Sequence, residues 1–157
     1  MVGLGNSDHN SSLREGIIMS SMVSRPPAAD SERALAHFES LLEFETDCWD
    51  VHHAIDNDRK DFVLLDVRNE EAFAKGHIPT AVSFPHWKIN VESLARYERE
   101  TLFVVYCAGP HCNGANKGAL KLAKLGRPVK ELIGGSLGWV DEGFQLVQAD
   151  SFAKASG

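Results

Sequence analysis

Residues 102–112 have the sequence LFVVYCAGPHC, which joins an apolar run to a cysteine and a glycine-containing loop. The apolar run predicts a strand that ends just before Cys107. A helical pattern follows at residues 115–125, and such a helix would direct its free backbone N–H groups and the positive end of its dipole at the loop. Electropositive settings of this kind lower a cysteine pKa to roughly 3.5–7.5. Cys107 is therefore a candidate nucleophile; the other interpretation is a buried, inert cysteine at a strand end.

Apolar runs alternate with helical patterns on both sides of this segment. The run FVLLDV at residues 62–67 is nearly continuous, as is typical of a strand buried on both faces of a parallel sheet. The expected strands are 43–45, 62–67, 81–84, 102–106 and 129–133. The expected helices are 31–41, one from residue 46 or 47 to about 55, 69–75, 92–98, 115–125 and 136–142. This alternation predicts an α/β fold with a central parallel sheet of about five strands and helices on both faces.

The length of 157 residues, 43% of them hydrophobic, suits one core of ordinary size. We expect a single domain at residues 31–148, with a flexible N-terminal tail at 1–30 and a C-terminal tail at 149–157. The first tail is rich in Ser, Gly, Asn and Pro and shows no sustained periodicity. Its one apolar patch, 16–23, is short and interrupted by serines, so we do not expect an export signal.

Charge and cysteine content exclude several classes of protein. The formal net charge is −6 and no run of Lys and Arg occurs, so a nucleic-acid partner is not expected. The apolar runs are too short for a membrane span. Three cysteines, Cys48, Cys107 and Cys112, are too few for a disulfide scaffold or a four-ligand zinc site. We therefore expect a protein of the reducing cytoplasm with no metal, in which Cys48 has a structural role.

Three segments resemble the signature segments of rhodanese-like sulfurtransferase domains, in the same order and spacing. They are LLDVRNEEAFAKGHIPTAVSFP, VVYC and VKELIGGSLGW, and the resemblance covers roughly residues 44–144. The resemblance implies an α/β domain in which Cys107 accepts sulfane sulfur as a persulfide, with no metal or organic cofactor. It further implies a small sulfur donor, such as thiosulfate, mercaptopyruvate or a persulfide, and a thiol or cyanide as acceptor. Thioredoxin or a sulfur-carrier protein are further candidate acceptors.

The loop after Cys107 is the expected substrate-binding segment, and it departs from the family's usual pattern. It is longer than usual and has no arginine to bind an anionic donor, so we expect thiosulfate to be a poor donor. It is similar to the CxGPxCNGA loop of a subgroup of small single-domain members. The loop residues are Ala108, Gly109, Pro110, His111, Cys112, Asn113 and Gly114.

Cys112 has two interpretations. It can attack a persulfide or sulfenic acid on Cys107 and close a disulfide, which would make the site redox-sensitive, or it can simply pack at the start of the helix. Asp66 and Arg68 lie at the carboxyl end of a buried strand. We expect them to support the site by pairing with each other or with loop backbone groups, rather than to bind substrate. His111 is expected to be solvated.

Three functions remain open at this point. The first is a sulfurtransferase or persulfide carrier of the thiosulfate sulfurtransferase type. The second is a redox-sensing or partner-binding module that uses a disulfide between Cys107 and Cys112. The third, a phosphatase or arsenate reductase of a related fold, would need an arginine in the loop to hold a tetrahedral anion, and the loop has none.

Overall fold

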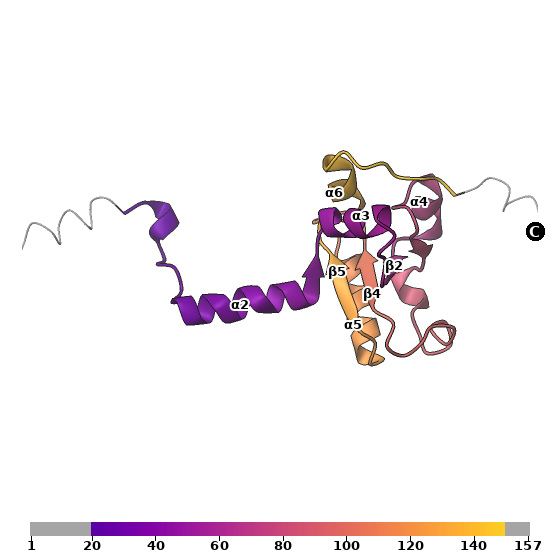
Figure 1. Ribbon diagram of the computed structural model, residues 1–157, viewed down its shortest axis with the longest axis horizontal. Helices are drawn as coiled ribbons and strands as arrows, with labels where there is room; N and C mark the ends of the chain where they lie inside the picture. The colour runs from indigo at the N-terminus through magenta and orange to yellow at the C-terminus, as the bar shows by residue number, and fades with distance from the viewer. Residues whose placement is uncertain (1–19, 150–157) are drawn as a thin grey trace, which may run out of the picture. The chain divides into compact units, whose positions relative to one another are not determined.

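The computed structural model describes residues 20–149 (Figure 1). The chain divides into two units, residues 1–39 and 40–157. The described part of the first unit contains the 3-10 helix η1, Met22–Ser24, and the start of helix α2, Ser31–Phe44. The second unit contains the sheet. The expected domain boundary at residue 31 stays a prediction, and most of the two expected tails, 1–19 and 150–157, lies outside the described residues.

The second unit is built on one parallel sheet of five strands, in the order β1-β5-β4-β2-β3. Its three middle strands, β5, β4 and β2, are labelled in Figure 1. Strand β4 lies at the centre, with Leu65 of β2 and Glu131 of β5 both in register with its Val105. The strands are β1 Glu45–Thr46, β2 Val63–Asp66, β3 Val82–Ser83, β4 Phe103–Tyr106 and β5 Val129–Leu132. The predicted α/β fold with a five-stranded parallel sheet is thereby confirmed.

Helices pack on both faces of the sheet. Phe103, Val105 and Cys107 belong to a buried cluster that α5 completes with Ala115 and Leu122. The alternate residues of β4 belong to a second cluster, which α3 and α6 complete. The helices of this unit after α2 are α3 Cys48–Asp56, α4 Glu70–Lys75, η2 His86–Lys88, α5 Gly114–Lys124 and α6 Gly135–Asp141. Because side chains of a strand alternate between the faces, β4 contributes to both clusters.

Local side chains fix where the short helices begin. The Asp47 carboxylate accepts from the backbone N–H of Asp50 over 2.8 Å and caps α3. The Asn69 side chain accepts from Ala72 N–H over 2.7 Å and caps α4 in the same way. Each cap satisfies a backbone donor that the first helical turn leaves free.

The helix predicted at residues 92–98 is wrong, because this segment forms a series of turns. Its N–H groups mostly bond three residues back, as in Tyr97 N–H to Leu94 O at 3.0 Å. The guanidinium of Arg127 donates to the carbonyl oxygens of Leu94, Tyr97 and Glu98. These carbonyl oxygens therefore accept hydrogen bonds from the side chain of Arg127, and not from the backbone N–H groups of an α-helix.

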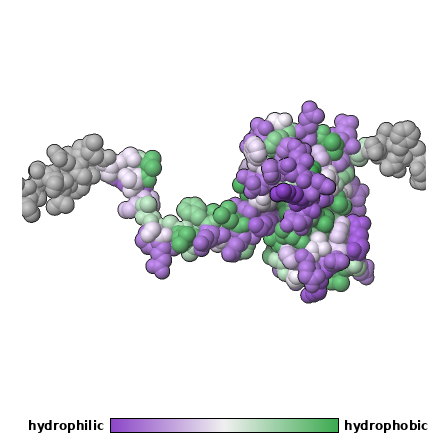
Figure 2. Space-filling view, in the orientation of Figure 1, coloured by the Kyte–Doolittle hydropathy of each residue, from purple (hydrophilic) through white to green (hydrophobic). Residues whose placement is uncertain are grey.

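The surface of the second unit is mostly hydrophilic on the face that Figure 2 shows. No helix within residues 20–149 has the length and apolar character that a membrane span requires.

Candidate functional site

Cys107 lies at the carboxyl end of the central strand β4, as the sequence predicted. Its residue surface is 6% exposed, and a disulfide joins it to Cys112. The two Cα atoms are 6.4 Å apart, which lies within the span of protein disulfides. The two loop cysteines are thus within bonding reach of each other.

The start of α5 lies directly against the two sulfur atoms. The backbone N–H of Gly114 donates to Cys112 Sγ over 3.4 Å, and that of Cys112 donates to Gly109 O over 3.0 Å. A Cβ at Gly114 would stand 2.8 Å from Cys107 Sγ. Glycine is therefore required at this position for the helix to approach the sulfurs. Helix N-termini favour negative charge, so this placement supports a thiolate on reduced Cys107.

The first turn of α6 holds the other side of the loop. Backbone N–H groups of Ser136 and Leu137 donate to the carbonyl oxygens of Cys107 and Ala108 at 3.0 and 2.9 Å. The Ser136 hydroxyl also donates to Ala108 O over 3.1 Å. Sequence analysis missed Ser136, because its partners lie far away in the chain and no motif marks them.

A cavity of about 580 Å³ opens beside the disulfide. Cys107, Cys112 and Cys48 all line it. The Cys48 thiol contacts the carbonyl oxygens of Ile133 and Gly135 at 3.7 and 3.8 Å. Burial, with the charges of Asp47 and Glu142, raises the pKa of Cys48 to about 11, so this thiol stays protonated at neutral pH.

The same cavity is lined by carboxylates that sequence analysis did not single out. They come from three separate segments of the chain, and the lining of the cavity includes no Lys, Arg or His. Burial, followed by the charge of Glu45, raises the pKa of Glu131, while a hydrogen bond from Asn116 lowers it. The four carboxylates are those of Glu45, Asp47, Glu131 and Glu142. No local pattern could have found them, because only the parallel sheet brings their segments to one edge.

The expected loop residues lie together around Cys112. A second hollow, of about 550 Å³, is lined by five of them and by Asn116. The five are Ala108, Pro110, His111, Cys112 and Asn113. His111 and Pro110 are exposed, while Gly109 is buried, and a Cβ there would stand 3.0 Å from Leu137 of α6. Within residues 20–149, no group of three or more His, Cys, Asp or Glu side chains is arranged to hold a metal ion.

Asp66 and Arg68 pair with each other, which is one of the two arrangements expected from the sequence. The Arg68 guanidinium donates to both Asp66 carboxylate oxygens and to Gly76 O. The Tyr106 hydroxyl donates to Asp66 Oδ2 over 2.7 Å and accepts from Ile78 N–H over 3.0 Å. This network joins β2, β4 and the turn after α4; within the described residues it makes no hydrogen bond to the 108–114 loop.

Burial shapes the protonation of this network. Burial and the charge of Asp66 raise the pKa of Tyr106, so its hydroxyl remains a donor. Burial lowers the pKa of Arg68, but the hydrogen bond and charge of Asp66 outweigh this effect and raise it. Because Tyr106 immediately precedes Cys107, the network fixes the end of the strand that leads into Cys107.

A family model, that of the rhodanese-like domain, matches residues 50–142, more than half of the chain. The chain belongs to the rhodanese-like domain family. It is 35% identical to the BH2092 protein of Bacillus halodurans, with a TM-score of 0.73 over 82% of this chain and 100% of the other. The loop subgroup stays a prediction.

Two further relatives have names that state an activity or a role. A thiosulfate sulfurtransferase from Pseudomonas aeruginosa is 26% identical with a TM-score of 0.57, over 71% of this chain and 21% of that one. The HTH-type transcriptional regulator Rv0324 of Mycobacterium tuberculosis is 36% identical over 94 residues, which are 55% of this chain. The match spans only 41% of the regulator's length. This chain is thus similar to part of a sulfurtransferase and to part of a transcriptional regulator.

Proposed function

We propose that this rhodanese-like protein is a sulfurtransferase that carries sulfane sulfur on Cys107. One observation carries the proposal: Cys107 stands at the carboxyl end of β4, at the wall of a cavity and against the start of α5. That position combines access for a small donor with backbone groups that favour a negative sulfur.

The chemistry has two steps after the disulfide is reduced by a dithiol. The Cys107 thiolate attacks the outer sulfur of a donor, forming a new S–S bond while the donor's own bond to that sulfur breaks; with thiosulfate, sulfite leaves. An acceptor thiolate then attacks the terminal sulfur of the Cys107 persulfide and takes it, which returns Cys107 as a thiolate. Covalent catalysis of this kind divides one transfer into two easier ones.

The disulfide favours a second candidate function, that of a redox-sensing module. A peroxide would oxidise the Cys107 thiolate to a sulfenic acid, and the Cys112 thiol would displace water from it to form the disulfide. A dithiol reductant would restore both thiols.

Intact-protein mass spectrometry separates the two candidates. The protein is reduced, desalted and treated briefly with thiosulfate, mercaptopyruvate or the persulfide of an aminothiol, in parallel with Cys107→Ser, Cys112→Ser and Cys48→Ser. We expect one added sulfur atom in the parent and in the Cys48→Ser control, and none in Cys107→Ser. If no donor adds sulfur, while peroxide removes two hydrogens only when Cys107 and Cys112 are both present, the redox function replaces the sulfurtransferase.

A Cys112→Ser variant that keeps its sulfur longer than the parent would show that Cys112 resolves the persulfide. In that step the Cys112 thiolate attacks Cys107 Sγ, the disulfide forms and hydrosulfide leaves.

A further inference from the structure

We propose that the cavity beside Cys107 favours uncharged or positively charged small sulfur compounds over anions, through the carboxylates of Glu45, Asp47, Glu131 and Glu142. As a statement about sulfur donors, this inference rests on the proposed function. As a statement about which reagents reach the Cys107 thiol, it stands by itself.

The sheet topology gathers the carboxylates at the cavity. Glu45 of β1 and Glu131 of β5 are direct partners in the parallel pairing, so their side chains are neighbours at one edge of the sheet. Asp47 follows β1 as the cap of α3, and Glu142 follows α6. All four side chains line the same cavity as Cys107.

Their negative charge is not balanced locally. Among the described residues none of the four forms an ion pair. The hydrogen-bond donors that contact them are neutral: the Asn116 amide for Glu131 and the Asp50 backbone N–H for Asp47. An anion that enters the cavity therefore meets carboxylates with no cation between them.

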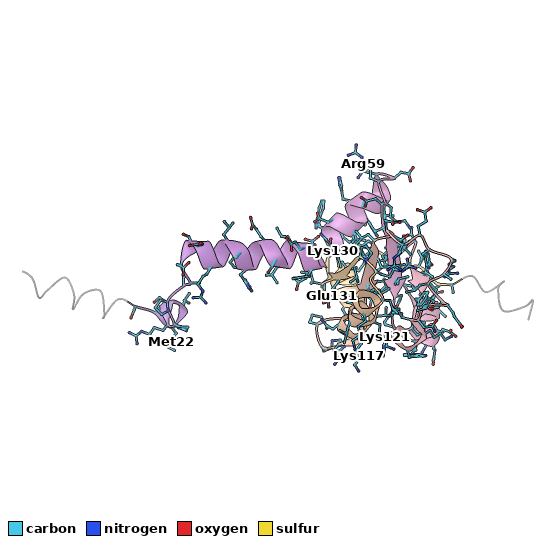
Figure 3. All side chains as sticks on the ribbon, turned by 90° about the horizontal axis from the view of Figure 1, so that it is seen from below. Met22, Arg59, Lys117, Lys121, Lys130 and Glu131 are labelled. Atoms are coloured by element: carbon cyan, nitrogen blue, oxygen red, sulfur yellow. A yellow bond between two sulfur atoms is a disulfide. The ribbon has the colours of Figure 1, made fainter. Side chains whose placement is uncertain are left out.

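The lysines on the neighbouring elements, which Figure 3 labels, form no ion pair with the four carboxylates among the described residues. Lys121 of α5 donates to the carbonyl oxygen of His86, and the charges of Lys117 and Lys121 both act on the His86 ring. Lys130 of β5 donates to Leu42 O over 2.8 Å. None of the three lines the cavity.

The negative charge of the carboxylates raises the pKa of two groups in the cavity. After burial, the charge of Glu45 raises the pKa of Glu131, and the charges of Asp47 and Glu142 raise that of Cys48. In both cases an additional negative charge is disfavoured. A thiosulfate dianion meets the same repulsion, whereas the persulfide of an aminothiol, which carries an ammonium group, is attracted.

A pair of methanethiosulfonate reagents of similar size tests the inference without any sulfur transfer. One carries a trimethylammonium-ethyl group and the other a sulfonatoethyl group. The Cys107 thiolate attacks the divalent sulfur of either reagent, a mixed disulfide forms and methanesulfinate leaves. Because the same thiolate attacks both, its pKa cancels in the ratio of the two rate constants.

The experiment uses the full chain with Cys112→Ser, and peptide mapping places the label on Cys107. The ratio of the rate constant for the cationic reagent to that for the anionic reagent is divided by the same ratio measured with 2-mercaptoethanol. This division removes the difference in intrinsic reactivity between the two reagents. We expect a normalised ratio of about tenfold at low ionic strength, falling toward one in about 1 M salt, where the Debye length is about 3 Å. Glu45→Gln with Glu142→Gln should lower it severalfold, and the distant Glu100→Gln should leave it unchanged.

A normalised ratio near one that ignores salt and both substitutions would overturn the inference, whatever the sulfur-loading experiment shows. The salt dependence is measured with all four carboxylates in place, so it does not depend on whether the variants fold. A high ratio in a protein that never gains sulfur would instead overturn the proposed function and leave the charge selectivity standing.

Discussion

The backbone N–H of Ser136 donates to the carbonyl oxygen of Cys107 over 3.0 Å. This bond ties the first turn of α6 to the end of β4 and so fixes the direction in which the 108–114 loop leaves the strand. Gly135 makes the approach possible, because its φ is +60° and a Cβ there would overlap the Cys107 carbonyl oxygen. The geometry at Cys107 therefore depends on a glycine from a distant part of the chain.

Gly135→Ala should displace the loop as well as destabilise the protein. We expect a loss of more than about 2 kcal/mol in the free energy of unfolding, from the steric overlap and the left-handed backbone together. Denaturant unfolding measures the loss, and the rate at which iodoacetamide alkylates reduced Cys107 reports the loop.

Gly143→Ala is the matched control for this substitution. Gly143 also has a positive φ, of +86°, but a Cβ there would meet no atom within 4 Å. Only the backbone cost of about 1–2 kcal/mol should appear, with Cys107 reactivity unchanged. Equal effects of the two substitutions would contradict the steric role of Gly135.

Gly114→Ala separates reactivity from stability. An alanine Cβ would stand 2.8 Å from Cys107 Sγ and 3.4 Å from Cys112 Sγ, so it occupies the space that a persulfide or a disulfide needs. Alanine also favours the first turn of α5 over glycine by up to about 1 kcal/mol, which offsets part of the strain. We expect sulfur loading and disulfide closure, both followed by intact mass, to slow at least about tenfold while the thermal midpoint changes little. A parent-like loading rate would show that the sulfurs have room to move.

Tyr106→Phe tests the buried network next to Cys107. The substitution removes the hydroxyl that serves Asp66 and leaves the buried Ile78 N–H without its acceptor. The expected loss is about 1–3 kcal/mol in the free energy of unfolding, measured with denaturant. Tyr97→Phe is the control, since the Tyr97 hydroxyl makes no hydrogen bond within the described residues, and it should cost less than about 0.5 kcal/mol. Similar losses in both variants would show that the hydroxyl of Tyr106 contributes little.

Most of the fold was predictable from sequence because it rests on local patterns. The run VLLD forms β2 within the expected strand, and the expected helix at 115–125 became α5, Gly114–Lys124. The expected strand at 43–45 begins later, at Glu45, because α2 continues to Phe44. The helix expected at 92–98 failed because Arg127, distant in the chain, binds the carbonyls of that segment. Local sequence patterns cannot predict a contact between residues so far apart in the chain.

The candidate site was predictable to a similar extent. Cys107 was placed correctly from the strand that precedes it. The pairing of Asp66 with Arg68 was one of two expectations drawn from their place at the carboxyl end of a buried strand. Their third partner, Tyr106, was missed, because it lies on the neighbouring strand β4, 40 residues from Asp66 in the chain. The carboxylates of the cavity were missed for the same reason, since their segments meet only after the sheet has formed.

His86 lies where η2 contacts α5, and Lys121 of α5 donates to its carbonyl oxygen. The His86 Nδ1 atom is buried and has no hydrogen-bond partner among the described residues. Burial, and then the charges of Lys121 and Lys117, lower the pKa of His86 below its ordinary value of 6.5. The folded state therefore binds a proton at His86 less readily than the unfolded state does. The stability that neutral His86 contributes is present above pH 6.5 and is lost as the pH falls through the lowered pKa.

Comparison of the parent with His86→Gln isolates this contribution. The difference in free energy of unfolding should shift against the parent as the pH decreases from about 8 to about 5, because only the parent has an imidazole there to protonate. NMR titration of the imidazole gives the pKa directly. Lys117→Gln should raise the pKa of His86 by removing a nearby positive charge. Lys124→Gln, the same change at the C-terminal end of α5, should leave the pKa of His86 unchanged. A His86 pKa at or above 6.5 in the parent would contradict both the burial of the ring and its exposure to the two lysine charges.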